Sequence, residues 1–443
     1  MHIFLILRSQ ARAAQAHLAA EIALPAAGRG RYGRRPEDGV MMKTQNLGMI
    51  AILAGLMAFA PMSIDMYLPA MPELTKAFGT DTARVQNTVA SFFLGFAIGQ
   101  AFFGPITDRF GRKKPLYVSL TLFALVSLGC IFAPDIDAFI ILRFLQALAA
   151  CAGVVIGRAV VRDVFESHEA VKVLGILTLI FGLAPVLAPM IGGYLLLYFG
   201  WWAIFLVLAL FGLASLFCVI FFLPETHRPQ DARPLALRSI LTTYGHLLGQ
   251  RRYLGYALCG GFGSAGMFAY ITGSPYVFME LFGVLPQHYG WFFGANALGL
   301  VLSAQVNGWL HRFVGSDTIL KAVVSLQALA GIVLAADAMT GFAGLWGIAA
   351  PLFVFVASLG FVSPNTTVMA MEPFRQIAGA ASALLGSLQF ILAFAASSAV
   401  SAITIAGALP MAGVIATCGI LSLVVLLTLV RKPLSAQTPS AQA

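Results

Sequence analysis

Two ionisable residues, Asp65 and Arg143, lie inside long apolar segments of this 443-residue sequence. A charged side chain at the centre of a membrane helix costs roughly 2.5–3.5 kcal/mol on insertion scales, so such residues are functional candidates. Asp65 lies about five residues before the outer end of its segment and Arg143 about five after the outer start of its own, roughly 7 Å inside the boundary. Opposite charges at matched depth can pair, which lowers the cost of each.

Asp65 is the residue that could change its charge during a working cycle. A carboxyl group in a medium of low dielectric is less costly when it is neutral, so proton uptake would switch off the attraction of Asp65 to Arg143. The sequence therefore predicts a proton-coupling pair formed by Asp65 and Arg143. The alternative is a static ion pair that only holds two segments together.

The composition indicates that the chain lies in a membrane. Hydrophobic residues make up 59% of it and charged residues only 10%, and one soluble core could not enclose so much apolar surface. The net charge of +9 arises from basic residues in short loops, which is not typical of nucleic-acid binding. The five cysteines lie in apolar segments without metal-ligand spacing. With no catalytic triad or phosphate loop in the sequence either, we expect no metal, no nucleic-acid partner and no enzyme.

Twelve segments are long and apolar enough to cross a hydrocarbon layer ~30 Å thick, which takes roughly 20 residues. They are predicted at 47–69, 85–107, 116–134, 138–160, 173–197, 202–223, 253–277, 289–311, 319–339, 345–370, 377–400 and 408–430. Loops on one side of these spans carry many Lys and Arg residues, whereas loops on the other side carry only Lys76 and Arg84. Because Lys and Arg accumulate on the cytoplasmic side, both termini are predicted to be cytoplasmic.

A polar break with several prolines and basic residues separates the first six spans from the last six. We therefore expect an all-α integral membrane protein with an N-terminal six-helix bundle at 46–226, a cytoplasmic linker at 227–251 and a C-terminal six-helix bundle at 252–432. Residues 433–443 are expected to form a C-terminal tail.

The first 45 residues do not fit this pattern. The stretch 1–45 is rich in Arg and has no complete signal-peptide pattern. We expect a disordered N-terminal extension, or a start assigned too early with Met41 or Met42 as the true beginning. An organelle transit peptide is the remaining alternative.

A strongly basic turn joins the second and third predicted spans. Its two glycines permit a sharp turn, and its charged side chains follow closely in sequence: Gly104, Asp108, Arg109, Gly111 and Arg112. A carboxylate there can meet a helix N-terminus or the basic residues of a neighbouring helix and hold the cytoplasmic side closed. The sequence predicts a conformational latch, or else a loop that only fixes the orientation of the chain.

The fifth predicted span is crowded with small residues and prolines, notably Pro185, Pro189, Gly192 and Gly193. Small faces let membrane helices approach closely, and Pro is tolerated when neighbours satisfy the backbone. This pattern predicts a hinge between the two bundles, or close packing alone.

Aromatic and a few polar side chains could line an apolar cavity with few fixed polar groups, which suits loose recognition. The candidate lining residues are Tyr67, Phe92, Phe96, Gln146, Met267, Tyr270, Tyr276, Asn296 and Phe390. Each of them alone is more typical of a packing or lipid-facing position.

Together these motifs resemble the major facilitator superfamily, and within it the drug:proton antiporters of the bicyclomycin/chloramphenicol resistance (Bcr/CflA) type. The loop at 104–114, the start of a fourth-span motif at 143–146 and an antiporter motif at 188–193 are similar to those of the superfamily. Three further segments resemble the Bcr/CflA branch: 64–70, 157–163 and 223–226. Ala147 and Ala188 stand where these motifs usually have glycine, and Trp202 where the branch often has arginine.

The resemblance implies a proton-driven multidrug efflux antiporter that exports small amphipathic compounds by alternating access across the cell inner membrane. It implies Asp65 as the proton-coupling carboxylate, Arg143 as its basic partner and Asp108 as the latch. We expect no cofactor, with the proton gradient as the energy source. The expected partners are the lipid bilayer, a small amphipathic substrate and protons, and the chain is expected to be a monomer. The alternatives are a proton-coupled metabolite transporter, importer or exporter, on the same fold, or a membrane scaffold or receptor without transport.

Overall fold

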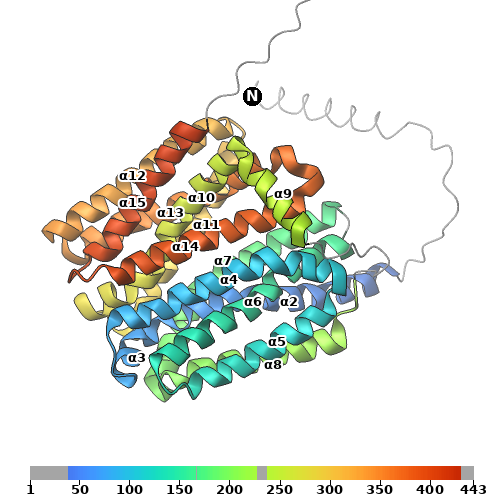
Figure 1. Cartoon of the computed structure of the whole chain (residues 1–443), viewed down its shortest axis with the longest axis horizontal. Helices are drawn as coiled ribbons and strands as arrows, with labels where there is room; N and C mark the ends of the chain where they lie inside the picture. Colours follow the sequence, from blue (N-terminus) through green and yellow to red (C-terminus); the bar gives the residue numbers. More distant parts are fainter. Residues whose placement is uncertain (1–37, 166, 227–236, 431–443) are drawn as a thin grey trace, which may run out of the picture. The chain divides into compact units, whose positions relative to one another are not determined.

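The structure is a computed structural model that describes residues 38–165, 167–226 and 237–430 (Figure 1). Contacts divide the chain into two units, Met1–Leu47 and Gly48–Ala443, and the site lies in the second. The predicted tail at 433–443 lies outside the described residues. So does most of the predicted extension.

Every element in the described ranges is helical, because a backbone in lipid must satisfy its own N–H and C=O groups within the segment. The first half contains, in order, α2 (Asp38–Asp65), η1 (Leu68–Ala70), α3 (Met71–Ala77), α4 (Thr82–Phe110), α5 (Lys113–Ile131), α6 (Ile136–Val164), α7 (Ser167–Phe199) and α8 (Trp202–Phe222). The second half contains α9 (Leu237–Gly249), α10 (Arg251–Ser274), the π-helix η3 (Pro275–Leu281), α11 (Pro286–Leu310), α12 (Ser316–Thr340), α13 (Gly344–Met371), η4 (Glu372–Ile377), α14 (Ala378–Ala402) and α15 (Leu409–Leu429).

Twelve helices of 19 residues or more lie in these ranges, one for each predicted span. Eleven of the described helical segments are long and apolar enough to cross a membrane. The remaining long helix is α11, which carries polar side chains at Asn296, Gln305 and Asn307. It packs between α7 and α13, so both of its neighbours are candidate spans.

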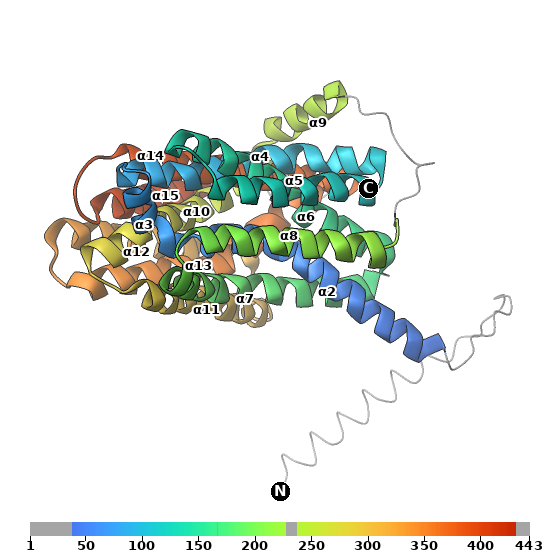
Figure 2. The ribbon, with the colours of Figure 1, turned by 90° about the horizontal axis from the view of Figure 1, so that it is seen from below.

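Most helix–helix contacts lie within one half, although α7 and α11 pack mainly against each other across the halves. In the first half α6 packs against α4 and α5, and α5 also packs against α8. In the second half α10 packs against α13, α14 and α15, and α12 packs against α13 and α15. Figure 1 shows the blue-to-green helices and the yellow-to-red helices as two groups, and Figure 2 shows them from below.

Two helix pairs join the halves, α4 with α14 and α7 with α11. In the first pair Ser387 Oγ donates a hydrogen bond to Ala97 O at 3.0 Å, and the rings of Phe96 and Phe390 lie 4.5 Å apart. The helix α9 also reaches the first half, because the Tyr244 hydroxyl donates to Ala101 O at 3.0 Å. Burial raises the pKa of Tyr244, so this hydroxyl keeps its proton at neutral pH.

Short turns join most consecutive helices, so the helix ends gather at two ends of the molecule. We call the end that carries Asp108 and Arg112 the basic-loop end, and the end that carries Asp65 the Asp65 end. Which of them faces the cytoplasm stays a prediction at this stage, as do the predicted domain boundaries.

Candidate functional site

Asp65 is the last residue of α2 and is 4% exposed. The sequence predicted a span that continues to residue 69, but the helix stops four residues earlier. The reason is Pro69, which has no N–H to give to the Asp65 carbonyl and whose ring would collide with that carbonyl in a continued helix. The chain turns at Met66 and Tyr67 instead and resumes as η1.

Arg143 is fully buried in α6, but it does not pair with Asp65. Its Nη1 donates to Gln146 Oε1 at 2.5 Å, and its Nη2 donates to Ser63 O at 2.9 Å. The guanidinium also lies 4.5 Å from the ring centroid of Tyr67 and 4.7 Å from that of Phe92. The predicted Asp65–Arg143 ion pair is therefore absent from this structure.

The correction has a physical cause in the end of α2. Ser63 belongs to the last turn of that helix, where carbonyl groups lack intrahelical partners and the helix dipole is negative. A guanidinium can donate to such a carbonyl when no ionised carboxylate is within reach. One N–H donor of Arg143 makes no hydrogen bond in this arrangement, because its Nε is buried without an acceptor.

Further polar groups hold Arg143 in place. Gln146 Nε2 donates to Ser127 Oγ at 2.7 Å, which orients the amide oxygen toward Arg143. The Tyr67 hydroxyl lies 2.6 Å from Thr88 Oγ1, which fixes the ring that covers the guanidinium. Sequence reasoning missed Ser127 and Thr88, because a single hydroxyl in an apolar helix carries no distinctive signal.

Asp65 itself faces the second half of the molecule. Among the described residues its carboxyl group has no hydrogen bond or ion pair, and the phenols of Tyr270 and Tyr289 in the second half lie near it. Tyr270 accepts a hydrogen bond from Asn296 Nδ2 at 3.1 Å, and the Tyr289 hydroxyl lies 2.7 Å from Ser274 Oγ. A buried carboxyl group without a cation or donor is less costly when it is neutral.

The residues predicted to line one substrate cavity form several contact groups in the structure, and Phe92 and Phe96, whose ring centroids lie 6.3 Å apart, connect two of these groups. Tyr67, Phe92 and Gln146 surround Arg143, as described above. Phe96 and Phe390 belong to an aromatic contact between the halves, Tyr270 and Asn296 bond to each other, and Met267 is partly buried. Tyr276 lines a cavity of about 350 Å³ together with Gln86 and Ser401. A substrate site at these nine positions remains a prediction.

The predicted latch is a charge network centred on Arg112. Its Nη1 contacts Asp108 Oδ1 at 2.8 Å, and its Nε contacts Asp163 Oδ2, from α6, at 2.9 Å. Burial alone would lower the pKa of Arg112, but the hydrogen bonds and charges of Asp163 and Asp108 raise it above the ordinary value. The guanidinium therefore stays charged.

Glu225 completes this network from the end of α8. Its carboxylate accepts from the backbone N–H of Arg112 at 2.8 Å and of Lys113 at 3.1 Å, which caps the N-terminus of α5. Gly111 has a φ of +81° and lies against this carboxylate, so a side chain there would be strained and crowded. Gly104 has open space around it, and Arg109 is exposed with its guanidinium 5.4 Å from the Phe110 ring centroid.

The partners of Arg112 described above all belong to the first half, which refines the prediction of a latch between helices. Asp108 meets the arginine of its own turn, and Asp163 and Glu225 attach that turn to α6 and α8. In the sequence analysis, Asp163 and Glu225 belong to two motifs but are not assigned a role in the latch. Partners this distant along the chain, more than 100 residues for Glu225, leave no local sequence pattern.

The predicted hinge lies in α7, which is one continuous helix with Pro185 and Pro189 inside it. Gly192 lies directly against the backbone carbonyl of Met66, and a Cβ on Gly193 would lie 2.8 Å from Pro286 O at the start of α11. Both contacts are at the Asp65 end. The small residues therefore allow close packing there, and hinge motion remains a prediction.

We expect Gly192→Ala to lower the thermal unfolding midpoint and transport together, because the methyl group would overlap the Met66 carbonyl oxygen. Overpacking of this kind costs roughly 1–3 kcal/mol. The matched control is Gly175→Ala in the same helix, where a Cβ meets nothing within 4 Å. Unfolding in detergent followed by tryptophan fluorescence tests this, and equal midpoints for the two variants would contradict the expected collision.

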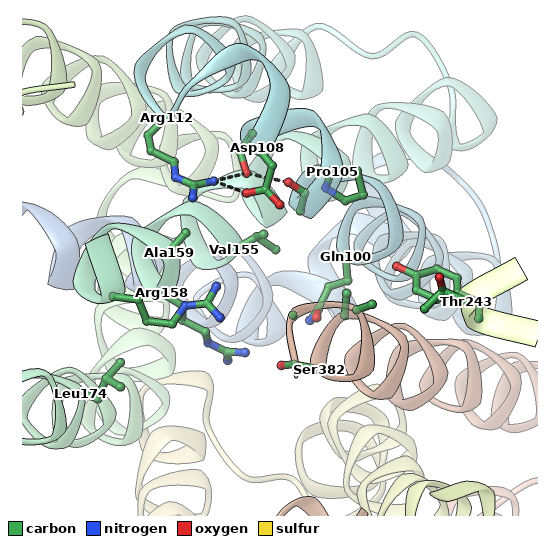
Figure 3. A pocket seen from close by; sticks show the side chains of 17 residues that line it. Gln100, Pro105, Asp108, Arg112, Val155, Arg158, Ala159, Leu174, Thr243 and Ser382 are labelled. Carbon is green, nitrogen blue, oxygen red and sulfur yellow. Dashed lines mark hydrogen bonds and ion pairs between the residues drawn. The ribbon is translucent and has the colours of Figure 1, made fainter. Parts of the chain in front are cut away.

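A cavity of about 380 Å³ lies at the basic-loop end, between α4, α6 and α7 of the first half and α9 and α14 of the second (Figure 3). Its walls include Asp108 and Arg112 of the charge network and Arg158 and Arg162 of α6. None of the nine predicted lining residues belongs to it. Both halves thus contribute walls to an open space at this end, as they do to the cavity of about 350 Å³ at the Asp65 end.

Two helical halves that enclose buried charges and a cavity define a class, the secondary transporters, in which substrate sites lie between repeats. The family model described as Major Facilitator Superfamily matches residues 53–397. The chain belongs to the Major Facilitator Superfamily, which confirms the family expected from its motifs. Its members are transporters and not enzymes.

Similar proteins with high coverage come from several bacteria. The chain is 37% identical to an uncharacterized MFS-type transporter of Bacillus subtilis, with 78% of this chain and 85% of that protein covered. It is 34% identical to a bicyclomycin resistance protein homolog of Haemophilus influenzae, with 80% and 89% covered. Multidrug resistance protein D of Escherichia coli is 28% identical, with 79% and 88% covered.

Solved structures support the fold. A crystal structure of a variant of the nucleoside transporter NupG gives a TM-score of 0.67 at 14% identity, with 87% of this chain and 99% of that chain covered. The partially occluded inward open form of the xylose transporter XylE from Escherichia coli gives 0.66 at 15% identity, with 87% and 97% covered. At these identities the likeness establishes the architecture alone.

Proposed function

We propose that this protein is a proton-driven antiporter that exports small amphipathic compounds by alternating access of its two six-helix bundles. The names of its relatives support a drug-like cargo, since they include a bicyclomycin resistance protein homolog, a chloramphenicol resistance protein and multidrug resistance protein D. The observation that carries the proton-coupled part is the position of Asp65, buried without an ionic partner at the junction of the two halves.

The proposed coupling uses the state of Asp65 to change what Arg143 binds. With Asp65 neutral, Arg143 holds Ser63 O and Gln146 Oε1, as in this structure. When Asp65 loses its proton, the new carboxylate attracts the guanidinium, whose Nε still lacks an acceptor. Movement of Arg143 toward Asp65 would release the end of α2 and uncover the Tyr67 and Phe92 rings. A proton that crosses the whole membrane through such a cycle gains about 2.3 kcal/mol per 100 mV of membrane potential.

We also propose an orientation of the chain in the membrane. The excess of Lys and Arg in the loops of one side supports cytoplasmic termini and a cytoplasmic basic-loop end. The proposed location is the bacterial inner membrane. The protein then works as a monomer, without a cofactor, and takes its energy from the proton gradient. Protons and a small amphipathic substrate are its remaining partners besides the lipid bilayer.

Antibiotic susceptibility in a bacterial host without its own efflux pumps tests this function. Expression of the chain should raise the inhibitory concentration of some amphipathic drugs several-fold, and a proton uncoupler should remove the gain. Unchanged susceptibility to a broad panel, combined with uncoupler-sensitive flux of a metabolite, would point to the metabolite transporter instead. Absence of any flux in the reconstituted protein would point to a scaffold or receptor.

A further inference from the structure

Arg158 and Arg162 of α6 line the 380 Å³ cavity without a partner of their own. Across the described part of the chain, the ion pairs and hydrogen bonds do not include either guanidinium. The two residues are four apart on one helix, so they share a face, and like charges in that arrangement destabilise a helix. Arg112, which lines the same cavity, has the carboxylates of Asp108 and Asp163 instead.

Arg158 lies within α6 and not at its end. It lies six residues before the end of α6, which is about 9 Å inside the helix. Protein surrounds its side chain, yet the side chain is solvent-accessible because it lies on the cavity wall. An arginine on the wall of a cavity keeps its charge by facing water or an anionic partner.

The opposite wall of the cavity is the first turn of α14. Gly379 and Ala380 line it, with Ser382 from the next turn; the 3-10 helix η4 ends at Ile377 directly before α14, and no side chain caps α14 there. The N–H groups of a first helical turn have no intrahelical acceptor, and the helix dipole is positive there, so helix N-termini bind anions. Figure 3 shows Arg158 and Ser382 pointing into the cavity from α6 and α14.

The charges of the lining residues agree with this arrangement. Among the residues that the structure describes, three arginines and one aspartate line the cavity, a net charge of +2, and the aspartate, Asp108, already contacts Arg112. Two unpaired guanidinium groups facing the start of α14 are suited to a planar or tetrahedral oxyanion, because Arg forms paired hydrogen bonds with carboxylate and phosphate.

We propose that this cavity binds an oxyanion, a carboxylate or a phosphate group, between Arg158 and Arg162 of α6 and the first turn of α14. A bound anion would connect the two halves at the basic-loop end. The volume admits more than a bare ion, so the group can belong to a small molecule from solution or to the headgroup of an anionic lipid. This inference does not depend on the nature of the exported compound or on proton coupling.

The test uses the full chain in nanodiscs of phosphatidylcholine at low salt, titrated with inorganic phosphate. Affinity is measured by calorimetry and by the rise in the thermal unfolding midpoint. We expect Arg158→Gln and Arg162→Gln each to weaken phosphate binding by at least about tenfold, and the double variant to abolish it. The matched control, Arg312→Gln, removes an exposed charge outside the cavity and should bind phosphate as the unchanged chain does.

A second arm distinguishes the two sources of the anion. Nanodiscs with phosphatidylglycerol should raise the unfolding midpoint and suppress phosphate binding if the lipid headgroup occupies the cavity, and the double variant should lose that effect. Phosphate binding that persists in these nanodiscs would identify a soluble anion as the ligand. Without any anion, the variants should unfold at the same or a higher temperature, because a like-charge contact is gone. The proposal is overturned if neither phosphate nor phosphatidylglycerol raises the unfolding midpoint of the unchanged chain. It is also overturned if both raise the midpoint of the double variant as much as that of the unchanged chain.

Discussion

Asp65→Asn should abolish substrate-dependent proton movement in proteoliposomes while the protein keeps its fold. Asparagine has nearly the same shape as aspartate but cannot release a proton at any accessible pH. Asp65 forms no ion pair in the described structure, so its replacement by a neutral amide removes no contact with a cation. We therefore expect an unfolding midpoint close to that of the unchanged chain, and exchange of substrate down its own gradient should continue.

Asp135→Asn is the matched control for this experiment. Asp135 caps α6 at the Asp65 end, where its carboxylate accepts from Ala138 N at 2.8 Å, and asparagine caps a helix equally well. The control should retain proton movement in full. Proton release that survives Asp65→Asn, measured with a pH-sensitive dye on substrate addition, would defeat the assignment of coupling to Asp65.

Arg143→Met should leave a folded protein that has lost at least about tenfold of its proton-driven transport. A methionine in this place removes the desolvation cost of a buried charge that has no ionic partner in the described structure. The loss of donors to Ser63 O and Gln146 Oε1 opposes that gain by about 1–3 kcal/mol for each group left unsatisfied. The net change in stability should therefore be small, although the change in transport is large.

Arg143→Lys separates charge from geometry. A lysine keeps the positive charge, but it lacks the planar fork that reaches Ser63 O and Gln146 Oε1 together and that stacks on Tyr67. We expect transport between that of Arg143→Met and that of the unchanged chain, measured in the same proteoliposomes. Full transport by the methionine variant would mean that Arg143 is only a packing residue.

Much of the fold follows from the sequence because lipid imposes simple rules. Four predicted spans have both boundaries within three residues of the observed helix boundaries. They are 319–339 for α12, 345–370 for α13, 377–400 for α14 and 408–430 for α15. Apolar length sets the extent of such helices, and glycine, proline and charged residues mark their ends. The family was also predicted correctly, because the basic loop and the fourth-span and fifth-span motifs are short and contiguous.

The site was predicted less well because its contacts are not local. The pairing of Asp65 with Arg143 was inferred from charge and depth, but the arginine bonds a backbone carbonyl of Ser63, and every residue has such a carbonyl. Proline at position 69 was the available signal that α2 ends at Asp65. The cap that Glu225 gives to α5 and the approach of Tyr270 to Asp65 depend on how helices pack, which the order of residues does not specify.

The hydrogen bond from Tyr244 to Ala101 places a restraint on the working cycle. The helix α9 packs on α10 and α14, while its tyrosine holds the last part of α4. Any rocking that widens the gap between α4 and α14 at that end must break this bond, at a net cost of about 1 kcal/mol, or drag α9 along. The helix α9 therefore does more than lie between the two halves in the sequence: its hydrogen bond to α4 opposes the opening of the cavity at the basic-loop end.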